Sequence, residues 1–369
     1  MESKRLIVVK VGTNTLTDFA GVLDRDYIRS FVEQVCEIRA RGYAPIIVTS
    51  AAIAAGIEEL GLKSRPSDIP TLQAAASVGQ VALVEAYSTE LKKQGVVAGQ
   101  VLLTRNDTAD RNAYLHARDT LMRLVDLGAV PVVNENDTVA VEEIRFGDND
   151  TLAALVATMV GAEKVVLLTD VEGLYTSDPR KDSGAEHIDV VEHIDRALLG
   201  MASGVGTSLG SGGMVTKLRA ARVLMSSGTP MVLCDGRKEN ALLEAFDGTS
   251  NGTYFNPQKD ASLTTRKRWI AIGGAIQGTI IVDDGAVRAL RKGGTSLLCP
   301  GVRTVLGDFE AGSPVAVQAA DGVIIARGLS GYTSQELRSV AGKQMAQAAE
   351  IVPNRNGAAV IHCDQMVLF

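Results

Sequence analysis

The sequence predicts an α/β protein, a three-layer sandwich around a mostly parallel sheet, followed by a small mixed β domain. Apolar runs of strand length alternate with longer segments whose apolar residues recur at helical spacing. Strands that are apolar throughout are typical of parallel sheets covered by helices on both faces. Beyond about residue 275, short β runs follow one another closely with glycine turns between them. This change of pattern predicts the second domain.

The expected elements of the first part alternate along the chain. The strands are expected at 6–11, 44–49, 96–103, 130–134, 164–169 and 230–234. The helices are expected at 24–41, 71–94, 112–127, 149–160 and 213–227. In sheets of this kind ligands bind at the carboxyl ends of the strands, so candidate site residues are sought there.

The C-terminal part has its own set of short elements. Strands are expected at 278–282, 296–298, 314–317 and 323–326, with helices at 285–292 and 334–341. A polar stretch with the basic cluster Arg266, Lys267 and Arg268 precedes them and is typical of a linker. We therefore expect a first domain at 1–255, a linker at 256–274 and a second domain at 275–369.

Composition and charge exclude several classes of protein. Apolar residues make up 46% and charged residues 22% of the 369 residues, as in ordinary soluble globular proteins. The net charge of −6 argues against bulk attraction to nucleic acid or anionic lipid. No apolar run reaches the ~18–20 residues of a membrane span, and the first residues do not resemble a signal peptide. The four cysteines lack CxxC or metal-ligand spacing, so we expect a cytoplasmic protein with reduced thiols and name no metal ligands.

A lysine interrupts the first apolar strand. Lys10 lies between Val9 and Val11, and Gly12 follows. Burying a lysine is costly unless it meets an anion, and a glycine lets the backbone approach that anion closely. A lysine that reaches solvent at a sheet edge is the alternative interpretation. The segment alone does not decide between a lysine that binds an anion and a lysine that reaches solvent.

Small and polar residues also follow the later strands. The strand that ends at Thr49 continues into Ser50 and a helix, whose first amides could bind an anion or be capped by Ser50 itself. Residues 134–138 follow one strand, and residues 146–152 begin a helix. Turn formation explains one such cluster. Two clusters at strand-to-helix junctions indicate recognition of an α-amino group and a carboxylate, with Asp150 holding nearby lysines.

Two further segments have the character of a phosphate site. The strand at 164–169 ends in Thr169 and Asp170. Residues 210–217 form a glycine-rich turn that begins a helix, with Lys217 one turn inside it. Such a turn can hold phosphates with backbone amides while the lysine neutralises charge. The spacing is not that of a Walker A motif, and a glycine-lined surface loop is the alternative.

Taken together, these segments resemble the glutamate 5-kinase family of the amino-acid kinase superfamily. The resemblance is carried, in the family's order, by Lys10–Thr13, Asn134–Thr138, Gly147–Leu152, Leu168–Arg180 and Gly210–Leu218. The C-terminal 95 residues resemble a PUA domain. The resemblance implies the amino-acid kinase fold and phosphorylation of the γ-carboxylate of L-glutamate by ATP, the first step of proline biosynthesis. It also implies Mg²⁺, which ATP oxygens and water would bridge.

The resemblance further implies which residues form the site. Glutamate would be bound by Ser50, Ala51, Asp137, Asp148 and Asn149. ATP would be bound by residues of four segments, namely Lys10, Gly12, Thr13, Thr169, Asp170, Ser211, Gly212, Gly213, Met214, Val215, Thr216 and Lys217. Lys10 and Lys217 would be catalytic, stabilising the phosphoryl group during transfer, and Asp150 would orient them.

One position departs from the family pattern. The family usually has glycine after the serine, in Ser-Gly-Ala-Ile, whereas Ala51 follows Ser50 here. A methyl group at this position would crowd the site or forbid a positive φ. We expect ligand binding to survive and the catalytic rate to be affected.

The resemblance also implies partners, and two alternatives stay open. It implies a homo-oligomer (dimer or tetramer), a glutamyl phosphate reductase that takes the labile product, and inhibition by proline through residues 137–149. One alternative is another amino-acid kinase, acting on aspartate, acetylglutamate or carbamate. The other is an RNA-binding or regulatory protein with a weakened kinase core. Residues 275–369 hold eight Lys/Arg and eight Asp/Glu, a balance that does not predict strong RNA binding.

Overall fold

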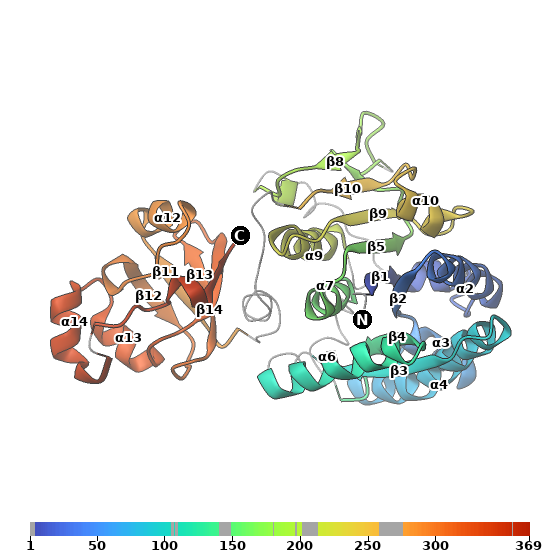
Figure 1. Ribbon diagram of the computed structural model, residues 1–369, viewed down its shortest axis with the longest axis horizontal. Helices are drawn as coiled ribbons and strands as arrows, with labels where there is room; N and C mark the ends of the chain where they lie inside the picture. Colours follow the sequence, from blue (N-terminus) through green and yellow to red (C-terminus); the bar gives the residue numbers. More distant parts are fainter. Residues whose placement is uncertain are drawn as a thin grey trace. The chain divides into compact units, whose positions relative to one another are not determined.

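The computed structural model describes residues 4–104, 107, 110–139, 149–179, 181–195, 198–200, 213–257, 276–355 and 357–369. The chain divides into two compact units, a larger one that carries β1 to β10 and a smaller one that carries β11 to β15 (Figure 1). Most of the expected linker lies outside the described residues. The domain boundaries given above therefore stay a prediction.

The larger unit is built on an eight-stranded sheet with the order β3-β4-β2-β1-β5-β9-β10-β8. Its strands are β1 (Arg5–Val11), β2 (Tyr43–Val48), β3 (Ala98–Leu103), β4 (Val130–Glu135), β5 (Lys164–Thr169), β8 (Val190–Val191), β9 (Met231–Asp235) and β10 (Thr253–Phe255). From β3 to β9 all neighbouring strands are parallel, and β10 is antiparallel to β9. The prediction of a mostly parallel sheet is confirmed.

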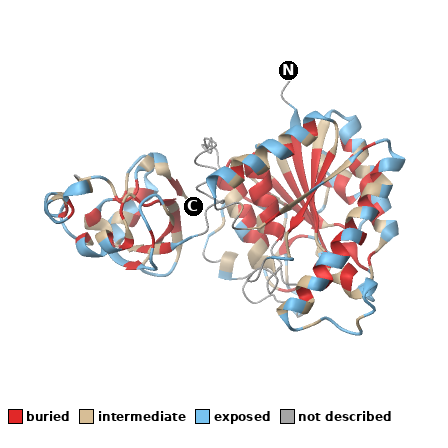
Figure 2. Cartoon of the chain, turned by 90° about the horizontal axis from the view of Figure 1, so that it is seen from below, coloured by how far each residue is buried: buried red, intermediate tan, exposed pale blue. Residues whose placement is uncertain are grey.

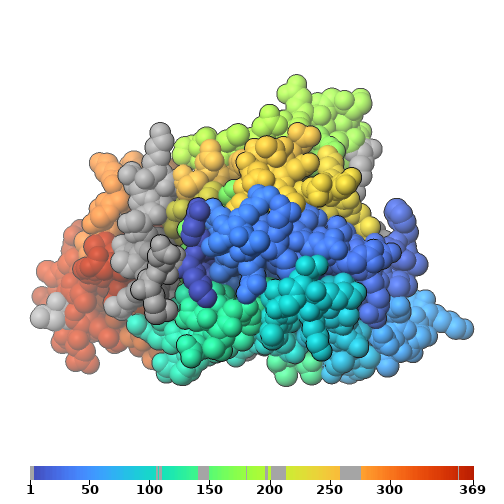
Figure 3. Space-filling view, turned by 45° about the vertical axis from the view of Figure 1, so that its right-hand side comes forward, coloured from blue at the N-terminus to red at the C-terminus, as the bar shows by residue number. Residues whose placement is uncertain are grey.

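Helices cover both faces of this sheet (Figure 2). One face packs against α2 (Arg25–Ala40), α4 (Ile69–Lys93) and α10 (Ala241–Asp247). On the opposite face α7 (Asn149–Val160) and α9 (Met214–Ser226) lie side by side (Figure 1). In the space-filling view α2 (blue) and the C-terminal part of α4 (cyan) lie next to each other on the surface (Figure 3).

Three more helices and a small hairpin complete the larger unit. The helices are α1 (Thr13–Leu16), α3 (Ala52–Glu59) and α6 (Arg111–Asp126). The hairpin pairs β6 (Leu174–Tyr175) with β7 (His187–Ile188). The expected helices at 24–41, 71–94, 112–127, 149–160 and 213–227 are all present, with ends that differ by a residue or two.

The alternation of side chains along β1 decides where Lys10 points. Ile7, Val9 and Val11 belong to the apolar core that includes α2 and α4. Because successive side chains of a strand point to opposite faces, Lys10 points to the face covered by α7 and α9. β1 lies between β2 and β5, in the middle of the sheet, and Lys10 is only 6% exposed. The alternative of a lysine at a sheet edge is therefore wrong.

Helices α3 and α4 are in backbone contact. A Cβ added at Gly79 would lie 1.9 Å from the carbonyl oxygen of Ala52, and one added at Gly56 would lie 1.7 Å from that of Ala75. Real Cβ atoms do not approach backbone oxygens so closely, so both positions require glycine. The start of α3 is thereby fixed by its contact with α4.

The smaller unit has its own sheet and core. The strand order is β12-β11-β13-β14-β15. The strands are β11 (Gly278–Val282), β12 (Val302–Leu306), β13 (Pro314–Ala319), β14 (Ile324–Leu329) and β15 (Met366–Leu368). The helices are α12 (Asp284–Arg291), α13 (Ser334–Val340) and α14 (Met345–Ile351). A separate set of buried apolar residues fills the interior.

One predicted strand of the smaller unit is wrong. Residues 296–298 form only the isolated bridge between Leu297 and Ile361. The 3₁₀ helix Cys299–Gly301 follows at once. Pro300 cannot donate to a ladder and Gly301 weakens a strand, so pairing stops there. The strands β12 and β15 and the helix α14 were not predicted from the sequence.

Within the described ranges, none of the helices combines the length and the apolar character that crossing a bilayer requires.

Candidate active site

The candidate site lies at the carboxyl ends of four neighbouring parallel strands. Lys10 is the penultimate residue of β1, Ser50 follows β2, Asn134 lies near the end of β4, and Thr169 ends β5. Helices α7 and α9 both begin at this edge. Residues far apart in the sequence therefore meet in one place, as expected for an open parallel sheet.

A carboxylate between two lysines forms the centre of the site. Lys10 Nζ lies 2.7 Å from Asp150 Oδ1, and Lys217 Nζ lies 3.1 Å from Asp150 Oδ2. Thr216 Oγ1 donates a hydrogen bond of 2.9 Å to the same Oδ2. The side chains of Lys10, Asp150 and Lys217 are 8%, 2% and 8% exposed. The sequence analysis predicted this grouping of the three charged residues.

The charges of this cluster do not cancel. Burial disfavours the ionised Asp150 carboxyl and by itself would raise its pKa, but the two ammonium groups outweigh burial and hold that pKa below its ordinary value. Two ammonium groups and one carboxylate give these three side chains a net charge of +1 (2 − 1), and the Asp170 carboxylate also interacts with Lys217. Such a cluster attracts an anion, because buried charges are costly unless they are neutralised.

The first turn of α9 adds backbone donors to the site. Gly213 is the N-cap of α9, and no side chain in the described part of the chain caps it. The first amides of a helix have no partner within the helix, and together with the helix dipole they favour an anion. Met214, Val215, Thr216 and Lys217 make up this turn, and the Thr216 amide already donates to Gly213 O at 3.0 Å. The amides of Met214 and Val215 are therefore the candidate donors to an anion. The turn lies beside Asp150 through the contacts of Thr216 and Lys217.

Asn149 connects the ends of β2 and β4. Its Nδ2 donates to Thr49 O at 2.6 Å and to Asn134 Oδ1 at 2.9 Å, and it lies 3.0 Å from Ser50 Oγ. Asn134 Nδ2 in turn donates to Gln80 Oε1 on α4 at 2.8 Å. The structure brings together Ser50 and Asn149, as the family resemblance implies.

Two members of this network were not predicted as site residues. They are Asn134 and Gln80. A signal for Gln80 exists in the sequence, because it falls on the stripe of α4 formed by Leu72, Ala76, Leu83 and Tyr87, all of which are buried. A polar residue on a buried stripe indicates a specific partner.

Asn14 joins the residues predicted to bind the nucleotide at the ends of β1 and β5. The Gly12 amide donates to Leu168 O at 3.0 Å, which joins the ends of β1 and β5. Thr169 Oγ1 donates to Asp170 Oδ1 at 3.1 Å, and Asn14 Nδ2 donates to Asp170 Oδ2 at 2.7 Å. Burial would raise the pKa of Asp170, but its hydrogen bonds, first that of Asn14, hold the pKa below the ordinary value. Asn14 was missed by the sequence analysis.

The remaining predicted residues are placed as follows. Thr13 is the first residue of α1, and Asp137 lies in the turn after β4. Asp148, Ser211 and Gly212 lie outside the described residues. Their roles stay predictions from the family resemblance.

Ala51 has the backbone conformation that favours glycine. It is the N-cap of α3, with φ of 74° and ψ of 8°, and it is 6% exposed. A left-handed conformation costs an L-residue with a Cβ roughly 1–2 kcal/mol. The methyl group does not prevent the positive φ, contrary to one of the two expected effects. The methyl group makes the left-handed backbone of Ala51 strained. This strained residue lies between Ser50 and the start of α3.

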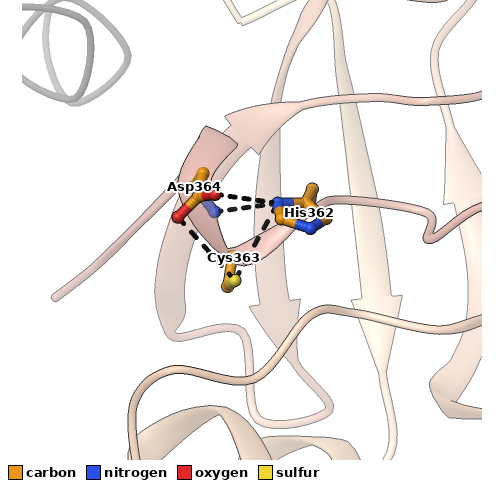
Figure 4. A group of neighbouring side chains, drawn as sticks. All are labelled: His362, Cys363 and Asp364. Carbon is orange, nitrogen blue, oxygen red and sulfur yellow. Dashed lines mark hydrogen bonds and ion pairs between the residues drawn. The ribbon is translucent and has the colours of Figure 1, made fainter.

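One group of possible metal ligands lies in the smaller unit (Figure 4). His362 Nδ1 lies 3.9 Å from Cys363 Sγ and 3.5 Å from Asp364 Oδ2. The three residues are adjacent in sequence, a pairing of His with Cys that the sequence analysis overlooked. His362 Nδ1 already accepts the Asp364 amide at 3.2 Å and so caps the 3₁₀ helix Cys363–Gln365. With the ring lone pair used and two of the three side chains exposed, the group is explained as a capped turn.

Two family models match the chain. Residues 5–235 match the amino acid kinase family, and residues 278–352 match the PUA domain. Relatives named glutamate 5-kinase match along almost the full length. The one from Vibrio vulnificus (strain YJ016) is 44% identical over 99% of this chain and 96% of its own. The one from Myxococcus xanthus (strain DK1622) is 44% identical over 100% of this chain and 97% of its own.

A solved structure supports the fold of the larger unit. Carbamate kinase from Giardia lamblia, bound to AMP-PNP, superposes with a TM-score of 0.50 and 16% identity. The match covers 70% of this chain and 100% of that one. At this identity the likeness concerns the fold alone.

The strain at Ala51 predicts an unusual effect of a glycine substitution. Ala51→Gly removes the left-handed penalty of roughly 1–2 kcal/mol, while the added chain entropy of glycine offsets about 0.5–1 kcal/mol of it. We expect the free energy of unfolding, measured in urea, to stay level or rise by up to about 1.5 kcal/mol. Ala52→Gly is the matched control, because Ala52 is helical and should lose about 1 kcal/mol. An equal decrease in the free energy of unfolding for both variants would contradict the strain assigned to Ala51.

The pairing of Asp150 predicts a stability difference that depends on pH. Asp150→Asn leaves two buried ammonium groups without a counter-charge, so we expect about 3–5 kcal/mol lower free energy of unfolding at pH 7. A lowered folded-state pKa stabilises the protein above the unfolded-state value of about 3.9. This stabilisation is lost as pH falls through the folded-state pKa. Wild type and variant should therefore differ equally from pH 5 to 8 and begin to converge below about pH 4, as the pH approaches the lower folded-state pKa. Urea unfolding over this range tests it, with the exposed Asp26→Asn as control, and a difference that grows toward acid would refute the pairing.

Proposed function

The chain belongs to the amino acid kinase family, and on this basis we propose that it transfers the γ-phosphoryl group of ATP to the γ-carboxylate of L-glutamate. The proposal is supported by similarity to glutamate 5-kinases along almost the full chain. The observation that carries it is the buried Lys10–Asp150–Lys217 cluster next to the Ser50–Asn149 pair. The charged cluster suits a phosphoryl group in transfer. The Ser50–Asn149 pair suits a small polar acceptor.

The chemistry of this transfer requires no general base. An oxygen of the acceptor carboxylate attacks the γ-phosphorus, and the bond to the bridging β–γ oxygen breaks. ADP takes the electron pair of that bond, and no proton has to be removed from the nucleophile. The obstacle is the repulsion between two anions, so alignment and neutralisation of charge are the main requirements. A buried cluster with a net positive charge meets the second requirement.

Each residue of the cluster has a distinct part in this proposal. Lys10 from β1 and Lys217 from α9 would contact the oxygens of the γ-phosphoryl group, together with the first amides of α9. Asp150 would hold the two ammonium groups together against their mutual repulsion. Ser50 and Asn149 would contact glutamate, and Asp137 its α-ammonium group.

Mg²⁺ is proposed to arrive with the nucleotide. The Asp150 carboxylate is held by both lysines and Thr216, which makes it a poor ligand for a second cation. The ion would therefore be bridged chiefly by ATP oxygens and water, and it would neutralise charge on the phosphates.

An acceptor panel tests the proposed function. The purified protein is incubated with ATP, Mg²⁺ and hydroxylamine, which traps acyl phosphates as hydroxamates. We expect ATP-dependent hydroxamate with glutamate, and far less with aspartate or acetylglutamate; ADP release with carbamate is measured in parallel. Ala51→Gly is run beside the wild type, to show how far the methyl group limits turnover. A preference for another acceptor would refute glutamate as the substrate.

Substitution of Lys217 tests the catalytic cluster. Lys217→Ala removes a cation that contacts the reacting phosphoryl group more strongly in the transition state than in the ground state. We expect kcat to fall by about 10²–10³-fold while the glutamate KM changes only a few-fold. Arg219→Ala is the matched control, since Arg219 is an exposed cation on the same helix. A kcat within a few-fold of wild type would show that Lys217 has no such role.

Regulation and assembly complete the proposal. We propose that proline inhibits the enzyme through the turn at 137–139 and the following residues, that the chain forms a homo-oligomer, and that a reductase consumes the labile acyl phosphate. We keep the cytoplasm as its predicted location. Titration with proline tests the proposed inhibition, and activity that stays flat up to millimolar proline would count against it.

Light scattering gives the mass of the assembly, and a monomer would refute the proposed homo-oligomer.

A further inference from the structure

A row of three buried side-chain amides links α4 to the candidate acceptor site. Gln80 Oε1 accepts from Asn134 Nδ2 at 2.8 Å, and Asn134 Oδ1 accepts from Asn149 Nδ2 at 2.9 Å. The three side chains belong to residues that are 9%, 2% and 6% exposed. They come from a helix, a strand and the start of a second helix. The row ends next to Ser50.

Backbone groups fix the direction of each amide. The Thr49 carbonyl can only accept, so the Asn149 amide must turn its NH₂ group toward it. The Glu135 amide can only donate, so Asn134 must turn its oxygen toward that group, at 2.9 Å. The NH₂ group of Asn134 then faces Gln80, which must offer its oxygen. The usual ambiguity between amide oxygen and nitrogen is thus resolved by the chain itself.

With the amides oriented in this way, the oxygen of Asn149 lacks a hydrogen-bond donor within the described ranges. Asn149 is the member of the row nearest the site. Asn149 Oδ1 is buried and has no hydrogen-bond partner among the described residues. Gln80 Nε2, at the other end, is in the same situation. An unpaired buried polar atom costs roughly 1–3 kcal/mol. Of these two atoms, Asn149 Oδ1 belongs to a residue proposed to contact the acceptor, so it is the one that a bound ligand would complete. An acceptor aligned in this way fits a cationic donor such as the α-ammonium group of an amino acid.

Gln80 is held in place by the backbone on which it sits. The neighbouring Gly79 is in contact with the Ala52 carbonyl and the Gly56 amide of α3, where a Cβ would be only 1.9 and 2.2 Å away. Helix α4 therefore fixes two sides of the site. It holds the start of α3 through Gly79 and the Asn134–Asn149 pair through Gln80.

We propose that Gln80 is a positioning residue for the acceptor amino acid. It contacts no substrate atom itself. By accepting from Asn134, it holds the NH₂ end of an amide whose oxygen the Glu135 backbone already orients. Asn134 is thereby kept against Asn149, whose Oδ1 receives the α-ammonium group. The inference rests on the proposed function. It extends the acceptor site to a helix that the sequence analysis did not include.

Gln80→Leu tests the inference, because leucine fills a similar volume and cannot accept a hydrogen bond. We expect the KM for glutamate to rise at least about 10-fold and the KM for ATP to stay within about two-fold of wild type. The ATP value should hold because the Lys10–Asp150–Lys217 cluster does not involve Gln80. Gln94→Leu is the matched control, the same substitution at the exposed end of α4, and it should change neither constant.

A double-mutant cycle separates positioning from a purely structural role. If Gln80 acts through Asn149, Gln80→Leu should lower kcat/KM for glutamate by at least about 10-fold in the wild type but by less than two-fold in Asn149→Ala. Effects that multiply in the double variant would overturn the proposal. So would a parallel rise of both KM values, or a glutamate KM within two-fold of wild type. If the wild type prefers another acceptor, the proposed function fails. The same ratios measured with that acceptor still decide the role of Gln80.

Discussion

The attraction between one buried carboxylate and two buried ammonium groups is the constraint on which the larger unit depends. Asp150 lies within 2.7 and 3.1 Å of the Lys10 and Lys217 ammonium nitrogens. Taken out of water, any one of these charges would be strongly unfavourable, and removal of one partner leaves the others uncompensated. The three charges are therefore held as a unit. Their surplus of one positive charge makes the unit incomplete without an anion, which is the property that a phosphoryl-transfer site needs.

This cluster explains several features of the fold that otherwise look unrelated. Lys10 reaches it only because β1 is central in the sheet and because its odd-numbered neighbours pack on the opposite face. Asp150 and Lys217 reach it only because α7 and α9 begin at the same sheet edge and pack together. The parallel arrangement brings the carboxyl ends of the strands to one place. Fold and site are thus linked through the direction of the strands.

The acceptor side of the site is built from neutral groups under tight steric control. The amides of Asn134 and Asn149 take their orientation from backbone groups, and glycines bring α3 and α4 into contact. Within this rigid setting Ala51 occupies a conformation that glycine adopts without strain. A rigid surrounding is what allows such strain to persist. The two halves of the site therefore differ in physical character, since charge dominates one and packing dominates the other.

The sequence by itself determined the mostly parallel sheet, the residues of the charged cluster, and six strands and five helices of the larger unit. These follow from local signals, namely apolar periodicity, and polar residues at strand ends. The short elements β6, β7, β8, β10, α1 and α10 were not predicted. The sequence did not determine whether Lys10 was buried, since that depends on the place of β1 in the sheet order. It also missed Gln80 and Asn14, whose partners are far away along the chain, and it named Asn134 only as part of the cluster at 134–138. In the smaller unit, β12 and β15 were not predicted, because β12 has the exposed polar pair Arg303 and Thr304 in its middle and β15 has only three residues. Only the tertiary structure decided these points, because hydrogen-bond partners and burial are properties of the packed chain and not of its local pattern.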